Sequence, residues 1–344
     1  MKKDSKNNRK NNGKRYCKTC SRLLVKDGFD RNKNQRWLCK NCKTSIRLKD
    51  ERQRNNEVFK KWLNWMLTKK TIDETVDYSR FTFWRNTKAF WDIVPTIIVT
   101  GEIYNHILID ATYLSKKALL VLFSPKGVVG FRWGNSENVE DYILLFKSVP
   151  APHYIVSDGH RTIESACRKA WKNTKIQRCF VHLKRFVQRK VGKFTENEIG
   201  QLLHKHCRKL FSIDTIAKAK RWEKAFLTDF ERHKEYIDEK VACEKRTPKS
   251  KGYYLRHRNL SVAWHHILSP LKKGHMWSFL SDEIKKCPRD TNRLEGGINT
   301  RIKELIMCHR GIKFSHEQRI AEWFLLSKSE FGIQGFLDDF HPFS

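Results

Sequence analysis

The 344-residue chain carries 70 lysines and arginines against 37 aspartates and glutamates, which gives it a formal charge of +33. Such an excess favours a polyanionic partner, with nucleic acid ahead of a membrane surface, and no run of 18 apolar residues is present that could cross a bilayer. Residues 1–15 are basic without a following apolar segment, so they do not read as a signal peptide. We expect a disordered tail there, which either touches DNA phosphates or is solvated and without function.

Four of the ten cysteines form two C-x-x-C pairs within residues 16–46, namely Cys17, Cys20, Cys39 and Cys42. In a large lysine-rich chain this pattern indicates metal rather than disulfides, and four thiolates at this spacing bind one structural Zn²⁺ tetrahedrally. We therefore predict a zinc ribbon of two short strands with a turn near Asp27-Gly28. The metal would supply most of its stability, because so small a unit cannot build its own core. DNA contact and a purely structural role both stay open.

Residues 50–95 are predicted to form a small helical module. Apolar residues from Phe59 to Leu67 follow a helical period, a break comes near residues 69–71, and Ser79 has the chemistry of an N-cap for a later helix. A short helix, a turn and a basic, aromatic helix are typical of a helix-turn-helix, although a three-helix linker bundle gives the same pattern. The candidates for contact with DNA are Arg80, Arg85 and Lys88.

Residues 100–180 alternate between apolar strands and amphipathic helices. Strands are predicted at 106–114, 117–124, 126–134, 153–159 and 175–178. A helix capped by Asn135 or Ser136 precedes the fourth strand, and a second helix from Arg161 to about Lys172 follows it. Three strands, a helix, a strand, a helix and a strand are the element order of the ribonuclease H-like fold, and we predict this α/β fold for the core.

Two aspartates stand at informative positions in these strands. Asp110 lies inside an otherwise apolar strand, where a carboxylate is costly to bury unless it is paired or coordinates metal. Asp158 ends the fourth strand, where open α/β sheets present their sites. If the first and fourth strands are neighbours, the two carboxylates converge. A buried acid with a structural partner and an exposed acid at a strand end are the alternatives.

A third acid stands in the stretch "DTNRLEGGINTRIKEL", where Glu295 is followed directly by two glycines. Taken alone, Asn292 and Glu295 have the spacing of a variant capping box at a helix start. Taken with the two aspartates, Glu295 is a candidate third metal ligand. Gly296 and Gly297 would let backbone or DNA approach closely there.

The motifs "LIDATY", "VSDGH", "RCFVH" and "TNRLEGGIN", in this order, resemble those of the DDE transposases of bacterial insertion sequences, in the IS256-like, Mutator-related group and within it the IS1249-like branch. The resemblance runs from His106 to Phe331. It implies that Asp110, Asp158 and Glu295 form the catalytic triad.

The resemblance also implies the chemistry and the partners. Two Mg²⁺ (or Mn²⁺) ions would be held by the triad, with Asp110 bridging both, for cleavage and strand transfer at terminal inverted repeats. A homodimer or higher assembly would act on double-stranded DNA in the bacterial cytoplasm, at the nucleoid and away from membranes. A transposase-derived regulator without catalysis, or a ribonuclease H-like nuclease without strand transfer, are the alternatives.

Residues 181–288 are predicted to be an all-helical insertion, and residues 289–344 to complete the core with helices that cover the sheet. The basic helix faces either grip DNA or are merely solvated, and Arg310 is expected to face DNA.

At the start of the insertion, Cys179 and His182 match the family's C-x-x-H element. A metal site would need partners such as His204, His206, Cys207 or Cys243. In the preferred interpretation His182 donates to a DNA phosphate or to a catalytic carboxylate, and a core cysteine with a satisfied histidine is the alternative.

Overall fold

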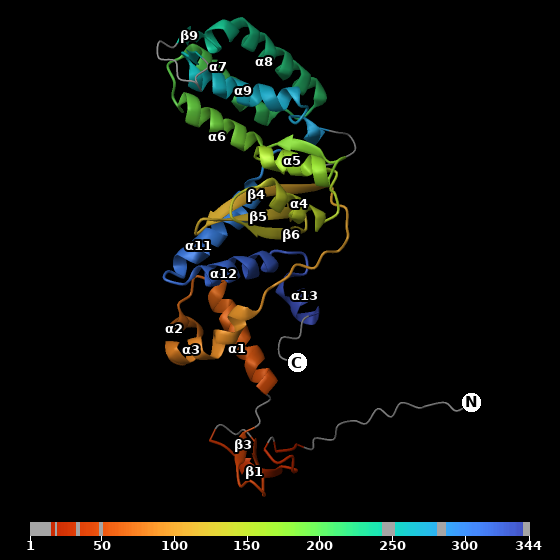
Figure 1. The fold of residues 1–344 in the computed structure, drawn as a ribbon, viewed down its shortest axis with the longest axis vertical. Helices are drawn as coiled ribbons and strands as arrows, with labels where there is room; N and C mark the ends of the chain where they lie inside the picture. The colour runs from red at the N-terminus through yellow and green to blue at the C-terminus, as the bar shows by residue number, and fades with distance from the viewer. Residues whose placement is uncertain are drawn as a thin grey trace, which may run out of the picture. The chain divides into compact units, whose positions relative to one another are not determined.

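The computed structural model describes residues 15–17, 19–31, 35–47, 51–242, 252–280 and 287–339. The chain divides into two units, one formed by Met1–Ile93 with His341–Ser344 and the other by Val94–Phe340 (Figure 1). Of the predicted tail, residues 1–14 lie outside the described residues. No helix within the described ranges combines the length and apolarity that a bilayer crossing requires.

The cysteine-rich segment forms a three-stranded antiparallel sheet from β1 (Val25–Phe29), β2 (Gln35–Leu38) and β3 (Ser45–Arg47). The prediction of a turn at Asp27-Gly28 is wrong, because both residues lie within β1. Gly28 has a φ of +61°, and the register between β1 and β2 shifts between Lys26 and Phe29. The glycine therefore accommodates a bulge in the strand, where a left-handed backbone favours a residue without Cβ.

The helical module consists of α1 (Glu51–Met66), α2 (Ile72–Thr75), α3 (Arg80–Thr87) and the 3₁₀ helix η1 (Lys88–Asp92). The predicted N-cap is confirmed, since the Ser79 side chain accepts from the backbone of Thr82. The aromatic residues of α1 form the core of the module. Trp62 is fully buried and meets Trp91 edge to face at 5.1 Å, so these rings are not a free surface for stacking on bases.

The second unit is built on a five-stranded sheet of β4 (His106–Leu114), β5 (Lys117–Ser124), β6 (Gly127–Gly134), β7 (Tyr154–Ser157) and β8 (Lys175–Arg178). Its order is β6-β5-β4-β7-β8. The first three strands in sequence pair antiparallel, and β7 and β8 add in parallel. The first and fourth strands are therefore neighbours, which is the condition under which Asp110 and Asp158 converge.

Helices cover both faces of this sheet. On β6, Arg132 pairs with Asp141 of α4 (Val139–Lys147), whereas the next residue, Trp133, donates to Glu322 of α12 (Phe314–Ser327) at 3.0 Å. Successive strand residues point to opposite faces, so α4 and α12 lie on opposite sides. α4 shares its side with α5 (Arg161–Ala170).

The start of α4 differs from the prediction. Its N-cap is Asn138, whose side chain accepts from the backbone of Asp141, and not Asn135 or Ser136. Both predicted caps lie in the bend that follows β6. The later residue forms the cap because its own side chain reaches the free N–H groups of the first turn.

The C-terminal part runs through α10 (Asn292–Leu294), a π-helical turn η4 (Glu295–Asn299), α11 (Thr300–Cys308), α12 and α13 (Gly332–Asp339). Contacts of α10 and η4 with β4 bring this distant segment to the first strand.

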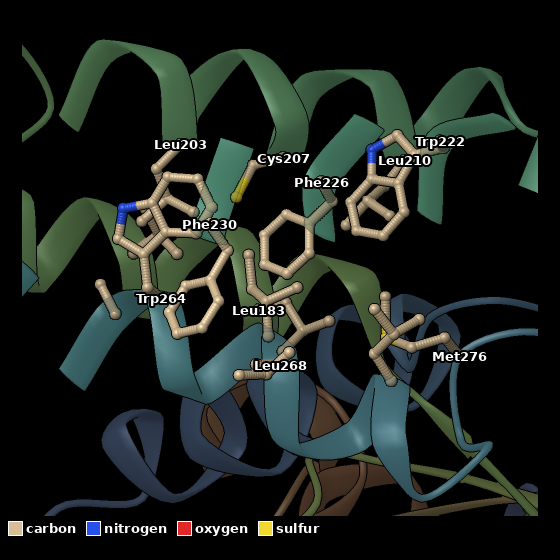
Figure 2. Packing of buried hydrophobic residues seen from close by; sticks show 14 of the residues in the cluster. Leu183, Leu203, Cys207, Leu210, Trp222, Phe226, Phe230, Trp264, Leu268 and Met276 are labelled. Carbon is tan, nitrogen blue, oxygen red and sulfur yellow. The ribbon is translucent and has the colours of Figure 1, made fainter. Parts of the chain in front are cut away.

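The segment between β8 and α10 is mainly helical, with α6 (Phe180–Val191), α7 (Glu198–Lys209), α8 (Ile216–Ile237) and α9 (Arg258–Lys272). The all-helical prediction is wrong in one detail, because β9 (Lys240–Ala242) and β10 (Tyr253–Leu255) form a short antiparallel pair. Figure 2 shows the shared core, in which Trp222, Phe226 and Trp264 lie among leucines. These tryptophans are buried and serve packing.

Candidate active site

The pairing of β4 with β7 places two of the predicted acids at the same level of the sheet. The two strands run parallel, and their last registered pair is Ile109 with Ser157. Asp110 and Asp158 are the next residues of the two segments, and neighbouring strands are about 4.8 Å apart. Burial raises the pKa of Asp110 to about 7, and the negative charges of Asp158 and Glu295 act in the same direction. All three predicted acids therefore share one electrostatic environment.

Asp110 has one direct partner from the far end of the chain. The side-chain amide of Asn299 donates to Asp110 Oδ2 at 2.7 Å. Asn299 is buried, and its Oδ1 atom has no hydrogen-bond partner among the described residues. A neutral oxygen of this kind next to a buried carboxylate adds to the set of hard donors at the site.

Glu295 begins the π-helical turn η4, in which Thr300 Oγ1 donates to the Glu295 carbonyl at 2.9 Å. π-Helical turns occur often at functional sites. A Cβ added at Gly296 or Gly297 would meet nothing within 4 Å, so the surface beside Glu295 is open. The capping-box alternative is wrong, because Thr291 is the N-cap of α10 and makes no side-chain cap bond, while Asn292 is already in the helix.

The Glu295 carboxylate is held by residues other than the two aspartates. Arg185 of α6 donates to Oε2, Thr291 donates to Oε1 at 2.9 Å, and His182 Nδ1 lies 3.5 Å from Oε1. Burial alone would raise the pKa of Glu295, but the hydrogen bonds from Arg185 and Thr291 hold it below its ordinary value. Glu295 is thus an ion-paired carboxylate in this state.

This arrangement decides which groups can share a metal. Among the described residues, the ligand atoms of Cys179, His182 and Glu295 all lie within 4.8 Å of one another. The three predicted acids do not form such a group in the described part of the chain. They are close enough to interact electrostatically, but Glu295 is grouped with Cys179 and His182 and ion-paired with Arg185.

A fourth acid, Glu137, was missed by the sequence analysis. Burial raises the pKa of Glu137, the nearby His160 lowers it, and the charge of Asp158 raises it again. Tyr142 donates to Glu137 at 3.2 Å. The sequence signal was present in "NSENVED", but acids before a helix are also ordinary helix-start chemistry.

Gly159, directly after Asp158, is fixed by two constraints. Its φ is +77°, and a Cβ there would lie 1.7 Å from Nη1 of Arg178. Arg178 is buried at the end of β8, and its Nη2 donates to His266 Nε2 of α9 at 2.9 Å. The guanidinium therefore packs on the backbone beside Asp158 and joins the sheet to the helical segment.

The four cysteines of the first unit meet as predicted and could hold zinc. Their Sγ atoms lie within 4.8 Å of one another, with Cys20 and Cys39 3.5 Å apart and Cys17 and Cys42 4.0 Å apart. Backbone hydrogen bonds from Cys20 and Thr19 lower the pKa of Cys17 to about 6. A lowered pKa favours the thiolate that binds zinc.

The predicted DNA-contacting residues are distributed over both units. In the first, Arg80 pairs with Asp73 at 2.6 Å, Arg85 lies 5.9 Å from the ring centre of Phe81, and Lys88 is exposed. In the second, Arg310 is exposed, whereas His182 lies beside Glu295.

Comparison with known families gives one match. Residues 128–244, about a third of the chain, match the model of the Mutator family of transposases. The matched residues include Asp158, Cys179 and His182, while Asp110 and Glu295 lie outside them. The match supports a Mutator-related transposase, a class that implies DNA binding and a nuclease or transferase activity in general terms. No curated protein matches the chain.

Gly159→Ala is expected to destabilise the second unit more than Gly274→Ala. Gly274 has a similar φ of +73°, but an added Cβ there meets nothing within 4 Å. The control should cost about 1–2 kcal/mol for left-handed backbone alone, and Gly159→Ala about 1–3 kcal/mol more for the clash with Arg178. Urea unfolding measures both. Equal losses would show that Arg178 does not pack on Gly159.

His266 should make the fold sensitive to acid. Burial, and then the charges of Arg178 and Arg189, lower the pKa of His266 to about 3. The unfolded chain binds a proton at this site below about pH 6.5 and the folded chain does not, so stability is lost as the pH falls from about 6.5 toward 3. His266→Gln keeps an acceptor for Arg178 without titrating. Urea midpoints of the variant should fall less steeply over this range, and parallel curves would contradict the assignment.

Cys39→Ser should remove one zinc ion per chain from the purified protein and unfold the three-stranded sheet, because the metal supplies most of the stability of so small a unit. Elemental analysis measures the metal. Cys308→Ser, which changes an exposed cysteine, is the control and should leave the zinc content unchanged. If Cys39→Ser holds as much zinc as the wild-type chain, the four-cysteine group does not bind zinc.

Proposed function

We propose that this protein is a DDE transposase that cleaves DNA at the terminal inverted repeats of an insertion sequence and joins the freed 3′ ends to target DNA. Within the Mutator-related transposases we place it in the IS256-like group, in the IS1249-like branch. The observation that carries the proposal is the pairing of β4 with β7, which places Asp110 and Asp158 at the same level of the sheet, with Asn299 of η4 donating to Asp110 Oδ2 at 2.7 Å.

The sheet supports a ribonuclease H-like core. Three antiparallel strands are extended by two parallel ones in the order β6-β5-β4-β7-β8, which is the arrangement expected from the element order of that fold. The pairing of β4 with β7 explains why Asp110 and Asp158, which are far apart in sequence, lie at the same level of the sheet, where β7 ends.

The residues around Asp110 and Asp158 fit divalent metal ions. Asp110, Asp158 and Glu295 offer hard carboxylate oxygens, as Mg²⁺ or Mn²⁺ requires, and Asn299 Oδ1 is a buried oxygen without a partner in the described ranges. Burial, and then the charges of Asp158 and Glu295, raise the pKa of Asp110, and a cation would relieve the repulsion between the acids. A pair of such ions supplies activation of the attacking oxygen and stabilisation of the leaving oxygen.

The chain's own residues would orient the reaction. Asp110, Asp158 and Glu295 would hold the two ions, and the Asn299 amide would keep the Asp110 carboxylate in place through its bond to Oδ2. To bind an ion beside the two aspartates, the Glu295 carboxylate would have to break its ion pair with Arg185. The freed Arg185 then has a charge and a fork geometry suited to a DNA phosphate.

DNA would be held by both units. We propose phosphate or groove contacts for Arg80, Arg85 and Lys88 in the helix-turn-helix-like module, and for His182 and Arg310 in the catalytic unit. Synapsis of two transposon ends would need a homodimer or higher assembly. The basic charge of the chain favours a nucleoid-associated protein.

The decisive assay incubates the full chain with DNA carrying the inverted repeats that flank its gene, in the presence of Mg²⁺. Nicked and joined products are expected. Asp110→Asn should lower cleavage by at least about 100-fold, since losing even an outer-shell partner costs 10–100-fold, and should leave the gel shift intact. Asp214→Asn, which changes an exposed acid paired with Lys218, is the matched control and should stay active.

The same assay distinguishes the alternatives. Nicking without joining would identify a nuclease of the same fold, and a gel shift without any chemistry would identify a transposase-derived regulator. Joining that survives Asp110→Asn would show that the site is assigned wrongly.

A further inference from the structure

In the folded chain, Cys179 and His182 of the C-x-x-H element lie beside a third candidate metal ligand that is distant in the sequence. Glu295 lies with Cys179 and His182 in one group of ligand atoms within 4.8 Å of each other. The other candidates are engaged elsewhere: His204 bonds to the Gly192 carbonyl, His206 pairs with Asp229, and Cys207 belongs to the helical core. Cys243 lies outside the described residues.

Backbone hydrogen bonds fix this group in place. Cys179 is the N-cap of α6, and its N–H donates to the Ser157 carbonyl at 2.8 Å. The next N–H, of Phe180, donates to the Arg289 carbonyl at 3.0 Å, just before α10. The two ends of the site are thus tied to β7 and to each other, so the ligands do not depend on a mobile loop.

A buried hydroxyl lies among the three side chains. Thr291 Oγ1 is 2.9 Å from Glu295 Oε1 and 3.5 Å from both Cys179 Sγ and His182 Nδ1. Thr291 is fully buried. The one hydroxyl hydrogen of Thr291 can be donated to only one of these groups at a time, so Thr291 satisfies this cluster only in part.

Burial raises the pKa of the Cys179 thiol, while hydrogen bonds from Thr291, His182 and Val181 act in the opposite direction. A bound cation would stabilise the thiolate at this buried position. Arg185 donates to Glu295 Oε2, and a hydrogen bond of this kind fixes the orientation of a carboxylate that binds metal through its other oxygen.

We propose that Cys179, His182 and Glu295 form a Zn²⁺ site with three protein ligands and a fourth, open position. A thiolate, an imidazole and a carboxylate suit zinc, whereas Mg²⁺ prefers oxygen donors alone. On binding, the Cys179 thiol releases its proton to solvent.

This site has a functional consequence that rests on the proposed function. Among the described residues, Glu295 shares a ligand group with Cys179 and His182 and not with the two aspartates. Zinc bound there holds the third carboxylate away from Asp110 and Asp158. Zinc therefore acts as a reversible inhibitor of DNA cleavage.

The metal content tests the site without any activity measurement. The full-length protein, equilibrated with buffered Zn²⁺, should hold two zinc ions per chain by elemental analysis. Cys179→Ser and Glu295→Gln should each hold one, Cys39→Ser one, and Cys39→Ser with Cys179→Ser none. Cys308→Ser, an exposed cysteine outside both groups, should keep two.

Co²⁺ gives a spectroscopic check on which residues bind. In the Cys39→Ser background, added Co²⁺ should produce a thiolate-to-cobalt absorption band that Cys179→Ser abolishes. Circular dichroism confirms that each variant is folded, and Glu295→Gln keeps the shape of the side chain if Cys179→Ser does not fold. One zinc ion per wild-type chain, or a cobalt band indifferent to Cys179, would overturn the proposal.

Cleavage with Mg²⁺ then tests the consequence. Added Zn²⁺ should inhibit the wild-type chain and a chelator should restore it, while the ratio of rates with and without zinc should stay near one for Cys179→Ser. If no chain cleaves DNA under any condition, the proposed function fails but the zinc count still decides this site. If cleavage is normal and only one zinc is bound, this inference alone fails.

Discussion

The cost of burying the Asp110 carboxylate is the constraint on which this site depends. β4 lies in the middle of the sheet, so the side chain cannot reach bulk water freely, and two further acids add their repulsion. One hydrogen bond from Asn299 offsets part of this cost. A buried carboxylate with like charges nearby must take up a proton or attract a cation. The fold keeps this unfavourable arrangement at one place, which is the pattern of a site selected for chemistry rather than for stability.

The helical segment contributes to the same place because α6 starts directly after β8. Cys179, His182 and Arg185 lie on its first turns, so the first half of the helix carries a thiol, an imidazole and a guanidinium to Glu295. The last residue of β8, Arg178, links the backbone beside Asp158 to His266 of α9. The helices are therefore part of the construction of the site, and their movement relative to the sheet would change the partners of its acids.

The features that could be predicted from the sequence depend on contacts between residues close together in the chain, and those that could not depend on contacts between distant residues. The strands β4, β5 and β8 agree with their predicted bounds because their apolar runs are bounded by clear turns, and Ser79 caps α3 because a cap is a contact over three residues. The turn predicted at Asp27-Gly28 was wrong because glycine favours a left-handed backbone in turns and in β-bulges alike. Asn299, Arg185 and Thr291 could not be placed, since their bonds to Asp110, Glu295 and Cys179 span more than a hundred residues. Glu137 was hidden by a helix-start pattern that explained it equally well.

The charge balance of the whole chain gives these long-range contacts their meaning. In a protein with a formal charge of +33, many cationic side chains are near any surface carboxylate, and Glu295 forms an ion pair with Arg185. The Arg185 side chain of this pair is about half exposed. Dissolved salt therefore screens the attraction between the two charges and weakens the pair. A DNA backbone is the strongest competitor for an arginine, and a divalent metal the strongest for a glutamate. If Arg185 binds DNA and Glu295 binds metal as proposed, binding of either one would weaken the pair and ease binding of the other, which would couple DNA and metal through a single contact.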